Sequence, residues 1–281
     1  MSVLAVAEKD FRDAIRSRLI IVVAVMFVAF TGGGVVLGET NLVAATSENL
    51  VGLILAVLLL GTSTFIPLVA IGVAYRAIAG ERASGSLKVL LSLPNSRLDV
   101  ILGKFLGRSA VIGLAILVGF VSMILAAALT FSGDIQAEVI LGFMLTALFL
   151  AIVFVSVAVG VSAFSDSTFI AAVGSFGLWV LFQFAWNGVL FLIGYVVNVF
   201  EAPNWGTDPP TWVDVFVVVN PITAFEQSTR WLLRRLDENR EVAQESAEAF
   251  YLEPWFGFVV LALWIVLPLV VGYLRFESAD L

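Results

Sequence analysis

The sequence predicts an all-α integral membrane protein with six transmembrane helices. Mean hydropathy is +1.05 and only 13% of the residues are charged, which lies far outside the range of soluble proteins. Six runs lack any charged residue, and each exceeds the ~18–20 residues that a helix needs to cross the hydrocarbon core. These runs are 19–38, 49–75, 109–133, 139–165, 167–200 and 254–274. They are continuously apolar without alternation, which argues against a transmembrane barrel.

Residues 1–18 predict an amphipathic helix that lies along the inner membrane surface. One predicted face carries Val3, Leu4, Ala7, Phe11, Ala14 and Ile15. The other carries Glu8, Lys9, Arg12, Asp13 and Arg16. Two interpretations stay open: the helix only anchors the topology, or it also contacts a cytoplasmic partner. A charged stretch precedes the first apolar run, which has full spanning length, so we expect that run to stay in the mature protein.

The predicted spans follow from the apolar runs and from the residues that interrupt them. They are 19–38, 50–75, 109–131, 139–164, 169–192 and 255–274. The fifth run is too long for one simple span, so we end that helix near Leu192 and expect a membrane-surface segment after it. Pro67 predicts a kink in the second span, either a hinge or static packing.

The distribution of Lys and Arg predicts which loops are cytoplasmic. The N-terminal segment and residues 76–108 are rich in both, whereas the connections 39–48 and 134–138 have neither. We therefore expect both termini, 76–108 and the turn 165–168 inside. Residues 201–253 fall outside, where their arginines sit among ten acidic residues, because a long loop translocates largely regardless of charge.

The external segment 201–253 is expected to be a small helical structure within a single domain, 1–281. Asn220-Pro221 predicts a break, and Thr223 with Glu226 predicts a capping box for the helix that follows. At about 50 residues with few apolar positions, the segment has little core of its own.

Composition excludes several kinds of chemistry. The chain has no cysteine and no histidine, which removes disulfides, cysteine nucleophiles, histidine acid–base catalysis and Cys/His metal sites. No charged residue lies inside the six runs, which argues against ion-coupled transport. Gln183 and Asn187 are polar residues of the fifth run; they either form interhelical hydrogen bonds or line a substrate path. A pI of 4.6 with only three lysines indicates a halophilic prokaryotic source or a single acidic loop.

The basic loop after the second span contains 81-ERASGSLKVLLSLP-94. Ser84 or Ser86 can cap a short helix at 87–92, Gly85 permits the turn before it, and Pro94 ends it. Leucines give this helix an apolar side, and the charged residues keep it at the water boundary. Burying an arginine at the bilayer centre would cost at least ~2.5–3.5 kcal/mol. We expect a short interfacial helix exposed to cytoplasmic partners.

The longer stretch 80-GERASGSLKVLLSLPNSRLDVILGKFLG-107 resembles the signature of ABC-2-type transporter permeases. That family shows E-R-x-S-G-(ST)-L, then L-L-S-L-P, then S-R, and G-K-F at the start of the third span. The topology, the N-terminal amphipathic helix and the Asn-Pro-x-x-x-Phe helix before the last span also agree. The resemblance implies that 79–98 is a coupling segment. The residues it implies in ATPase coupling are Glu81, Arg82, Gly85, Leu87, Lys88, Leu90, Leu91 and Pro94.

The resemblance also implies a permease subunit for export that is not itself an enzyme. It would sit in the cell membrane and contact lipid, two ATP-binding subunits that carry ATP and Mg, and a second copy or a homologous permease. No cofactor and no nucleic acid are expected on this chain. The substrate stays open among drugs, lipids, peptides and polysaccharides; without His, Cys or a buried carboxylate, we expect no ion to be held. The alternative is a membrane scaffold that recruits an ATPase for assembly or mechanical work without moving a solute.

Overall fold

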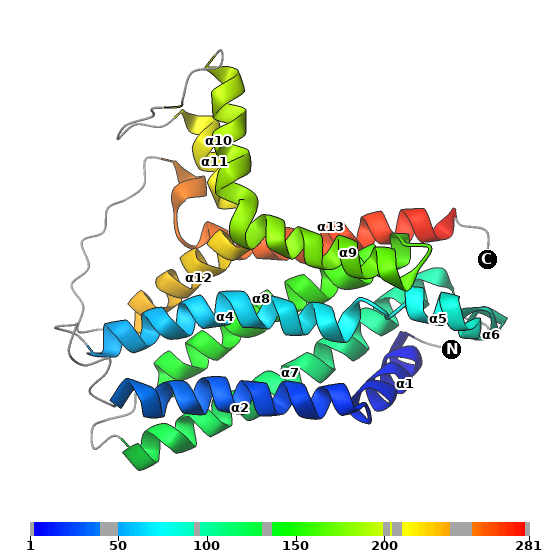
Figure 1. The fold of residues 1–281 in the computed structure, drawn as a ribbon, viewed down its shortest axis with the longest axis horizontal. Coiled ribbons are helices and arrows are strands. Elements are labelled where there is room, and N and C mark those ends of the chain that lie inside the picture. Colours follow the sequence, from blue (N-terminus) through cyan, green and yellow to red (C-terminus); the bar gives the residue numbers. More distant parts are fainter. Residues whose placement is uncertain are drawn as a thin grey trace.

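The computed structural model describes residues 3–39, 50–92, 96–130, 137–198, 203, 210–236 and 249–278, and these form helices without any strand. Figure 1 shows a bundle of long helices with shorter ones at its ends. In chain order the N-terminal half contains α1 (Val3–Ile15), α2 (Arg18–Glu39), α4 (Leu50–Ala74), α5 (Ala79–Ser84), α6 (Ser86–Ser92) and α7 (Arg97–Thr130). The C-terminal half contains α8 (Ala137–Phe164), α9 (Thr168–Val180), the π-helix η1 (Leu181–Ala185), α10 (Trp186–Val197), α11 (Thr211–Val219), α12 (Pro221–Leu236), the 3₁₀ turn η2 (Phe250–Leu252) and α13 (Phe256–Glu277).

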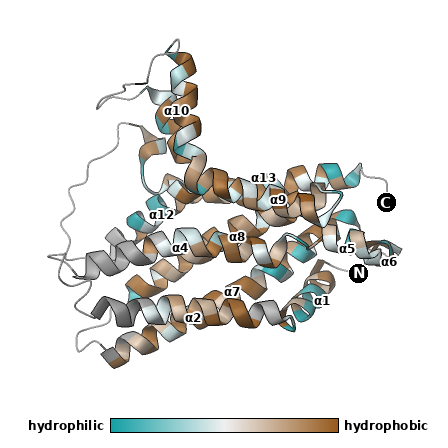
Figure 2. Ribbon diagram, viewed as in Figure 1, coloured by the Kyte–Doolittle hydropathy of each residue, from teal (hydrophilic) through white to brown (hydrophobic). Residues whose placement is uncertain are grey.

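The long helices of the bundle are mostly apolar, as Figure 2 shows. Five in the described ranges have the length and composition to cross a membrane, so the protein is a multi-pass membrane protein. They are Gly61–Ser84, Arg97–Ala126, Glu138–Phe164, Thr168–Val197 and Phe256–Glu277. The first predicted span is represented by the shorter apolar helix Ile21–Gly33, within α2. The count of six spans therefore stays a prediction.

Helix α8 lies at the centre of the bundle, against α4, α7, α12 and α13. It is apolar all round, as expected for a helix surrounded by others. Its contact with α13 depends on two glycines. A Cβ on Gly160 would overlap the carbonyl group of Pro268, and one on Gly272 would lie 2.7 Å from the carbonyl oxygen of Gly160. Small residues thus let the two backbones approach closely, which is how membrane helices gain packing energy.

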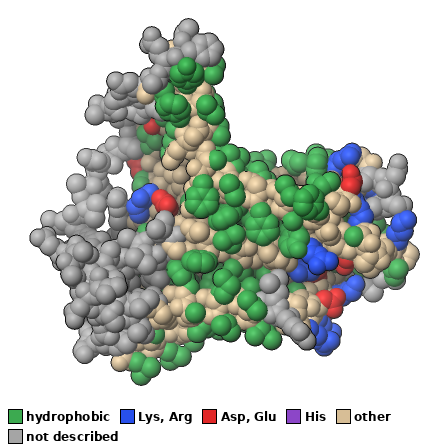
Figure 3. All heavy atoms as spheres, viewed as in Figure 1, with side chains coloured by type: hydrophobic (Ala, Val, Ile, Leu, Met, Phe, Trp, Pro, Cys, Tyr) green, Lys and Arg blue, Asp and Glu red, His purple; other side chains and the backbone are tan. Residues whose placement is uncertain are grey.

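The described parts of α1, α5, α6 and the end of α13 gather at one end of the bundle (Figure 1). Figure 3 shows that most of the visible Lys and Arg side chains lie at this end. We call it the basic end. This arrangement agrees with the predicted distribution of loops, in which both termini and residues 76–108 share a side. Which side of the membrane it faces stays a prediction.

The fifth apolar run is not a straight span. The helix continues to Val197 rather than ending near Leu192, and the π-helical turn η1 interrupts it. At this turn the chain changes direction sharply, so that α10 leaves the bundle beside α11 (Figure 1). A π turn adds a residue to the helical repeat, which is a recognised cause of such bends. The sequence carries no proline here that would have indicated it.

Aromatic side chains hold the bend. Phe182 of η1 meets Trp264 of α13 with ring centroids 4.9 Å apart, and Trp186 stacks on Phe216 of α11 at 4.4 Å. The two indoles donate hydrogen bonds to α11 carbonyls: Trp186 Nε1 to Phe216 O at 3.0 Å, and Trp264 Nε1 to Val219 O at 2.8 Å. The α10–α11 pair is therefore anchored to the bundle through its base.

Helix α12 begins at Pro221 and takes its cap from Asn220. The Asn220 side-chain oxygen accepts a hydrogen bond from Ile222 N at 2.8 Å, while its amide donates to Phe182 O at 2.9 Å. Proline suits the first helical position because its missing N–H would be unpaired there anyway. The predicted Thr223–Glu226 capping box is wrong, because the helix has already begun two residues earlier.

Candidate functional site

The segment that follows the second span forms two short helices, α5 and α6, joined at Gly85. Gly85 has φ 75°, and its amide donates to Arg82 O at 3.2 Å to close α5. A residue with a Cβ in this left-handed conformation would cost about 1–2 kcal/mol. The predicted turn is confirmed, and α6 begins at Ser86, one residue before its predicted start.

The start of α5 is capped by another helix. The hydroxyl of Ser162, on α8, accepts hydrogen bonds from Ile78 N at 3.1 Å and Ala79 N at 3.0 Å. Ser162 is completely buried. The first amides of a helix have no partner within it, so this hydroxyl fixes α5 directly to the central helix of the bundle.

The side chains of Glu81 and Arg82 both pair within the protein. Glu81 pairs with Lys104 of α7 at 2.8 Å. Arg82 donates to Ser165 O at 2.8 Å and meets Asp166 at 3.2 Å, in the turn between α8 and α9. These two side chains are 23% and 17% exposed, so each one pairs within the chain and still reaches the water boundary. Their role within the chain is to tie the segment to its neighbours.

A buried ion cluster lies beneath the segment, at the contact of α1 with α7. Asp10 is 5% exposed and meets two cations of α7: Lys104 at 3.2 Å and Arg108 at 2.8 Å. We define the ion cluster as Asp10, Glu81, Lys104 and Arg108. The expectation that the chain holds no buried carboxylate is wrong at Asp10, although both of its oxygens already face cations.

Glycines of α7 create the place where α1 sits. A Cβ on Gly103 would lie 2.5 Å from Val6 Cβ, and one on Gly107 would lie 2.9 Å from the Asp10 carboxylate. The buried stripe of α1 is Val6, Asp10 and Ala14, whereas Leu4, on the apolar face predicted to lie along the membrane, is 72% exposed. Val6 and Asp10 are four residues apart on α1, and Gly103 and Gly107 are four residues apart on α7. This shared spacing is the sequence signal for the contact of α1 with α7, and the sequence analysis missed it.

The apolar residues of α6 divide between the interior and the surface. Leu87 and Leu90 are buried, at 1% and 6% exposure, and Leu91 is partly buried against the same core. Val89 is 67% exposed, and Lys88 is exposed beside it. Leu87 and Leu90 therefore hold α6 against the core of the protein, and their part in ATPase coupling stays a prediction. Pro94 lies outside the described residues.

A groove of about 580 Å³ opens between α1 and α6 at the basic end. Its floor and walls come from both helices. The lining residues are Ala5, Val6, Glu8, Lys9, Arg12, Asp13, Arg16, Ser86, Val89 and Leu90. Both signs of charge line the α1 side, and Arg12 pairs with Glu8 there. The exposed face of α1, predicted to be an interfacial helix, thus forms one wall of a surface site.

The two polar residues of the fifth run lie in different surroundings. Gln183, within η1, donates to the Thr64 hydroxyl of α4 at 3.4 Å, close to Pro67. The structure thus shows an interhelical hydrogen bond for Gln183, one of the two roles predicted for it. Asn187 is exposed on α10. Because the helix bends at η1, Gln183 contacts the bundle, whereas Asn187 lies on the part of the helix that leaves it.

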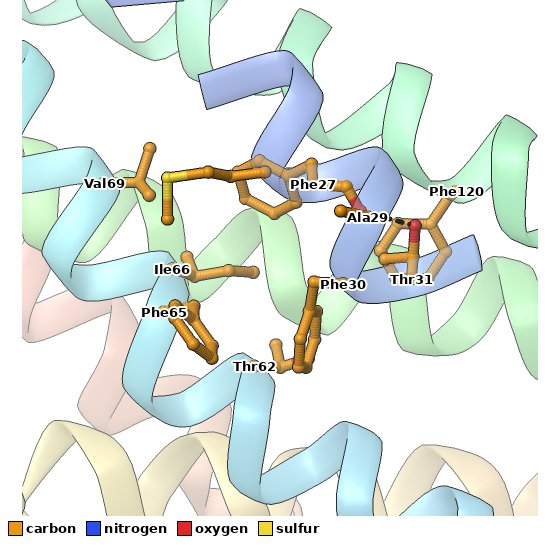
Figure 4. Close-up of a pocket in the computed structure, with 10 residues that line it drawn as sticks. Phe27, Ala29, Phe30, Thr31, Thr62, Phe65, Ile66, Val69 and Phe120 are labelled. Carbon is orange, nitrogen blue, oxygen red and sulfur yellow. Dashed lines mark hydrogen bonds between the residues drawn. The ribbon is translucent and has the colours of Figure 1, made fainter. Parts of the chain in front are cut away.

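A second cavity, of about 330 Å³, lies between α2 and α4 (Figure 4). Its walls are mostly apolar, with Phe27, Phe30, Phe65 and Ile66 turned toward it. The hydroxyl of Thr31 lies within hydrogen-bonding distance of Phe27 O and Gly119 O, both at 2.7 Å. None of the described residues that line the cavity carries a charge, so the cavity suits hydrocarbon.

Comparison with known proteins agrees with this architecture. The family model for ABC-2 family transporter protein matches residues 4–281. The chain is similar to the probable ABC transporter permease protein NosY of Pseudomonas aeruginosa, with 33% identity over 204 residues, 68% of this chain and 70% of that protein. It is also similar to the protein of the same name from Stutzerimonas stutzeri, with 31% identity over 66% of this chain and 68% of that protein. The chain therefore belongs to the ABC-2 family of transporter proteins.

Proposed function

We propose that this protein is the permease subunit of an ABC transporter that exports its substrate. ATP and Mg would bind to two separate ATP-binding subunits, and this chain would form the translocation path. Membership of the ABC-2 family supports the permease role. The observation that carries the coupling role is the α1–α6 groove at the basic end.

An ATP-binding subunit would dock into this groove by inserting a helix end or loop between α1 and α6. Val89 supplies an exposed apolar anchor, and the charged residues of α1 form a polar rim. Interfaces commonly gain most of their energy from such central anchors, whereas rim charges mainly set association rate and salt dependence. Lys88 would belong to the rim. Leu87 and Leu90 would act from inside, by holding α6 in place.

The translocation path would form between two permease chains, either two copies or this chain and a homologue. The span Thr168–Val197 is the least buried of the five candidate spans, with 17% of its apolar stretch buried inside the protein. Its surface is thus available to lipid or to a second chain. In this arrangement Asn187, exposed on α10, would line the path, and Gln183 would connect the bend to the kinked α4.

The test is co-purification with an ATP-binding subunit co-expressed in the same membrane. Val89→Asp places a charge in the groove and should weaken association by about 30-fold, which corresponds to the ~2 kcal/mol of a central anchor. Ser92→Asp adds the same charge to an exposed position of α6 outside the groove lining and is the matched control. Equal recovery of the ATP-binding subunit with both variants would refute docking at the groove.

Transport is tested separately, by ATP-dependent flux of candidate substrates in proteoliposomes that hold both kinds of subunit. We expect accumulation on the side opposite to the ATP-binding subunits. ATP hydrolysis with docked subunits but no flux of any of the four substrate classes would favour the scaffold alternative.

A further inference from the structure

The ion cluster joins three elements through one side chain. Lys104 of α7 is 3% exposed, and its ammonium group meets Asp10 of α1 at 3.2 Å and Glu81 of α5 at 2.8 Å. Arg108, one turn further along α7, meets Asp10 and also donates to Val73 O of α4 at 2.8 Å. Two carboxylates and two cations balance, so the cluster can stay buried without a net charge.

A shared buried cation makes its two partners interdependent. If Glu81 is removed, Lys104 keeps only Asp10, and if Asp10 is removed, it keeps only Glu81. Breaking a buried pair on one side leaves an uncompensated charge, which is far more costly than loss of a surface pair. The position of α1 and the position of α5 are therefore linked through Lys104, although the two carboxylates are 71 residues apart in sequence.

We propose that Asp10, Lys104 and Glu81 make α1 and the α5–α6 segment a single mechanical unit, in which Asp10 is the positioning residue. The use of this unit rests on the proposed function: a subunit that displaces α6 would move α1 with it and pull on α7. The α1–α6 groove would then keep its shape while its two walls move together. Without the cluster, α6 could move alone, and its motion would not reach α1 and α7.

The test uses thiol labelling of the purified chain in nanodiscs, without any ATP-binding subunit. The chain has no natural cysteine, so a single buried cysteine reports how often its helix opens. Val6→Cys reports on α1 and Leu87→Cys on α6, while Ala163→Cys in α8 reports on the bundle; all three native side chains are buried.

The decisive result is a cross-effect. Asp10→Asn should raise labelling of the α6 reporter at least tenfold, and Glu81→Gln should raise labelling of the α1 reporter at least tenfold. Lys104→Met should raise both. Asp13→Asn, on the exposed side of α1, is the matched control and should change neither by more than twofold.

Two results would overturn the proposal. If each substitution loosens only its own helix, α1 and α5–α6 are independent anchors. If the α8 reporter rises as much as the others, the cluster supports the whole fold rather than this unit. Should Asp10→Asn fail to fold, Glu81→Gln, at a partly exposed position, carries the test at the α1 reporter alone. Because no ATP-binding subunit is present, failure here leaves the Val89→Asp result intact, and the reverse also holds.

Discussion

Substitution Gly103→Ala should displace α1 from α7. The new Cβ would lie 2.5 Å from Val6 Cβ and 3.0 Å from Val3 O, whereas carbon atoms pack at about 3.5–4.0 Å. Helix α1 would have to move by about 1 Å. A shift of that size would stretch the 2.8 Å contact between Asp10 and Arg108 beyond hydrogen-bonding range.

The expected change in the free energy of α1 docking is the sum of three contributions. Overpacking costs about 1–3 kcal/mol, and weakening of a buried ion pair adds to it, while alanine gains about 1 kcal/mol over glycine within a helix. The net loss for docking of α1 is about 2 kcal/mol, or a roughly 30-fold rise in its opening.

The assay is thiol labelling of a cysteine at Ala14, which is 5% exposed at the far end of α1. Gly113→Ala is the matched control, because it changes the same helix in the same way. Its Cβ would meet only Leu148 Cδ1, at 3.4 Å. We expect fast labelling with Gly103→Ala and slow labelling with Gly113→Ala. Equal rates would refute the conclusion that α1 is seated on Gly103.

Three further predictions concern packing, topology and pH. Gly160→Ala would force its Cβ into the Pro268 carbonyl group, where backbone cannot yield, and should lower the thermal midpoint by several degrees; an unchanged midpoint would contradict the α8–α13 contact. An impermeant thiol reagent added outside intact cells should label a cysteine at Glu245 and spare one at Lys88; the opposite pattern would reverse the topology. Burial raises the pKa of Glu226 above 4.5, so its folded form holds a proton more tightly than its unfolded form, and stability is lost as pH rises through the folded pKa. Glu226→Gln should therefore flatten the fall in thermal midpoint as the pH rises above 4.5, and a fall as steep as in the wild type would count against this origin.

The sequence predicted those features that depend on neighbours along the chain. Apolar runs of spanning length predicted membrane helices, because the thickness of the bilayer sets the length of an apolar helix. Gly85 predicted the turn between α5 and α6, since few other residues adopt its backbone conformation. The signature in 80–107 predicted the family. A high-salt source rests on composition alone and stays a prediction.

The bend at η1 shows where local patterns stop being informative. Residues 181–185 are apolar apart from Gln183, and their composition suits a straight helix as well as a π turn. The choice depends on Phe216 of α11, Asn220 at the C-terminal end of α11 and Trp264 of α13, which all contact the bend. A helical bend that is stabilised by distant partners has no signal in its own residues.

The tertiary structure alone decided which face of each amphipathic helix turns inward. Periodicity showed that Leu87 and Leu90 share a side of α6, but lipid, a partner protein and the protein core are all apolar surroundings for such a side. Asp10 and Lys104 are 94 residues apart, so neither helix by itself indicates that their charges meet in the interior. A buried carboxylate is tolerated only where a cation is already in place, and only the packing of α1 on the glycines of α7 brings the two together.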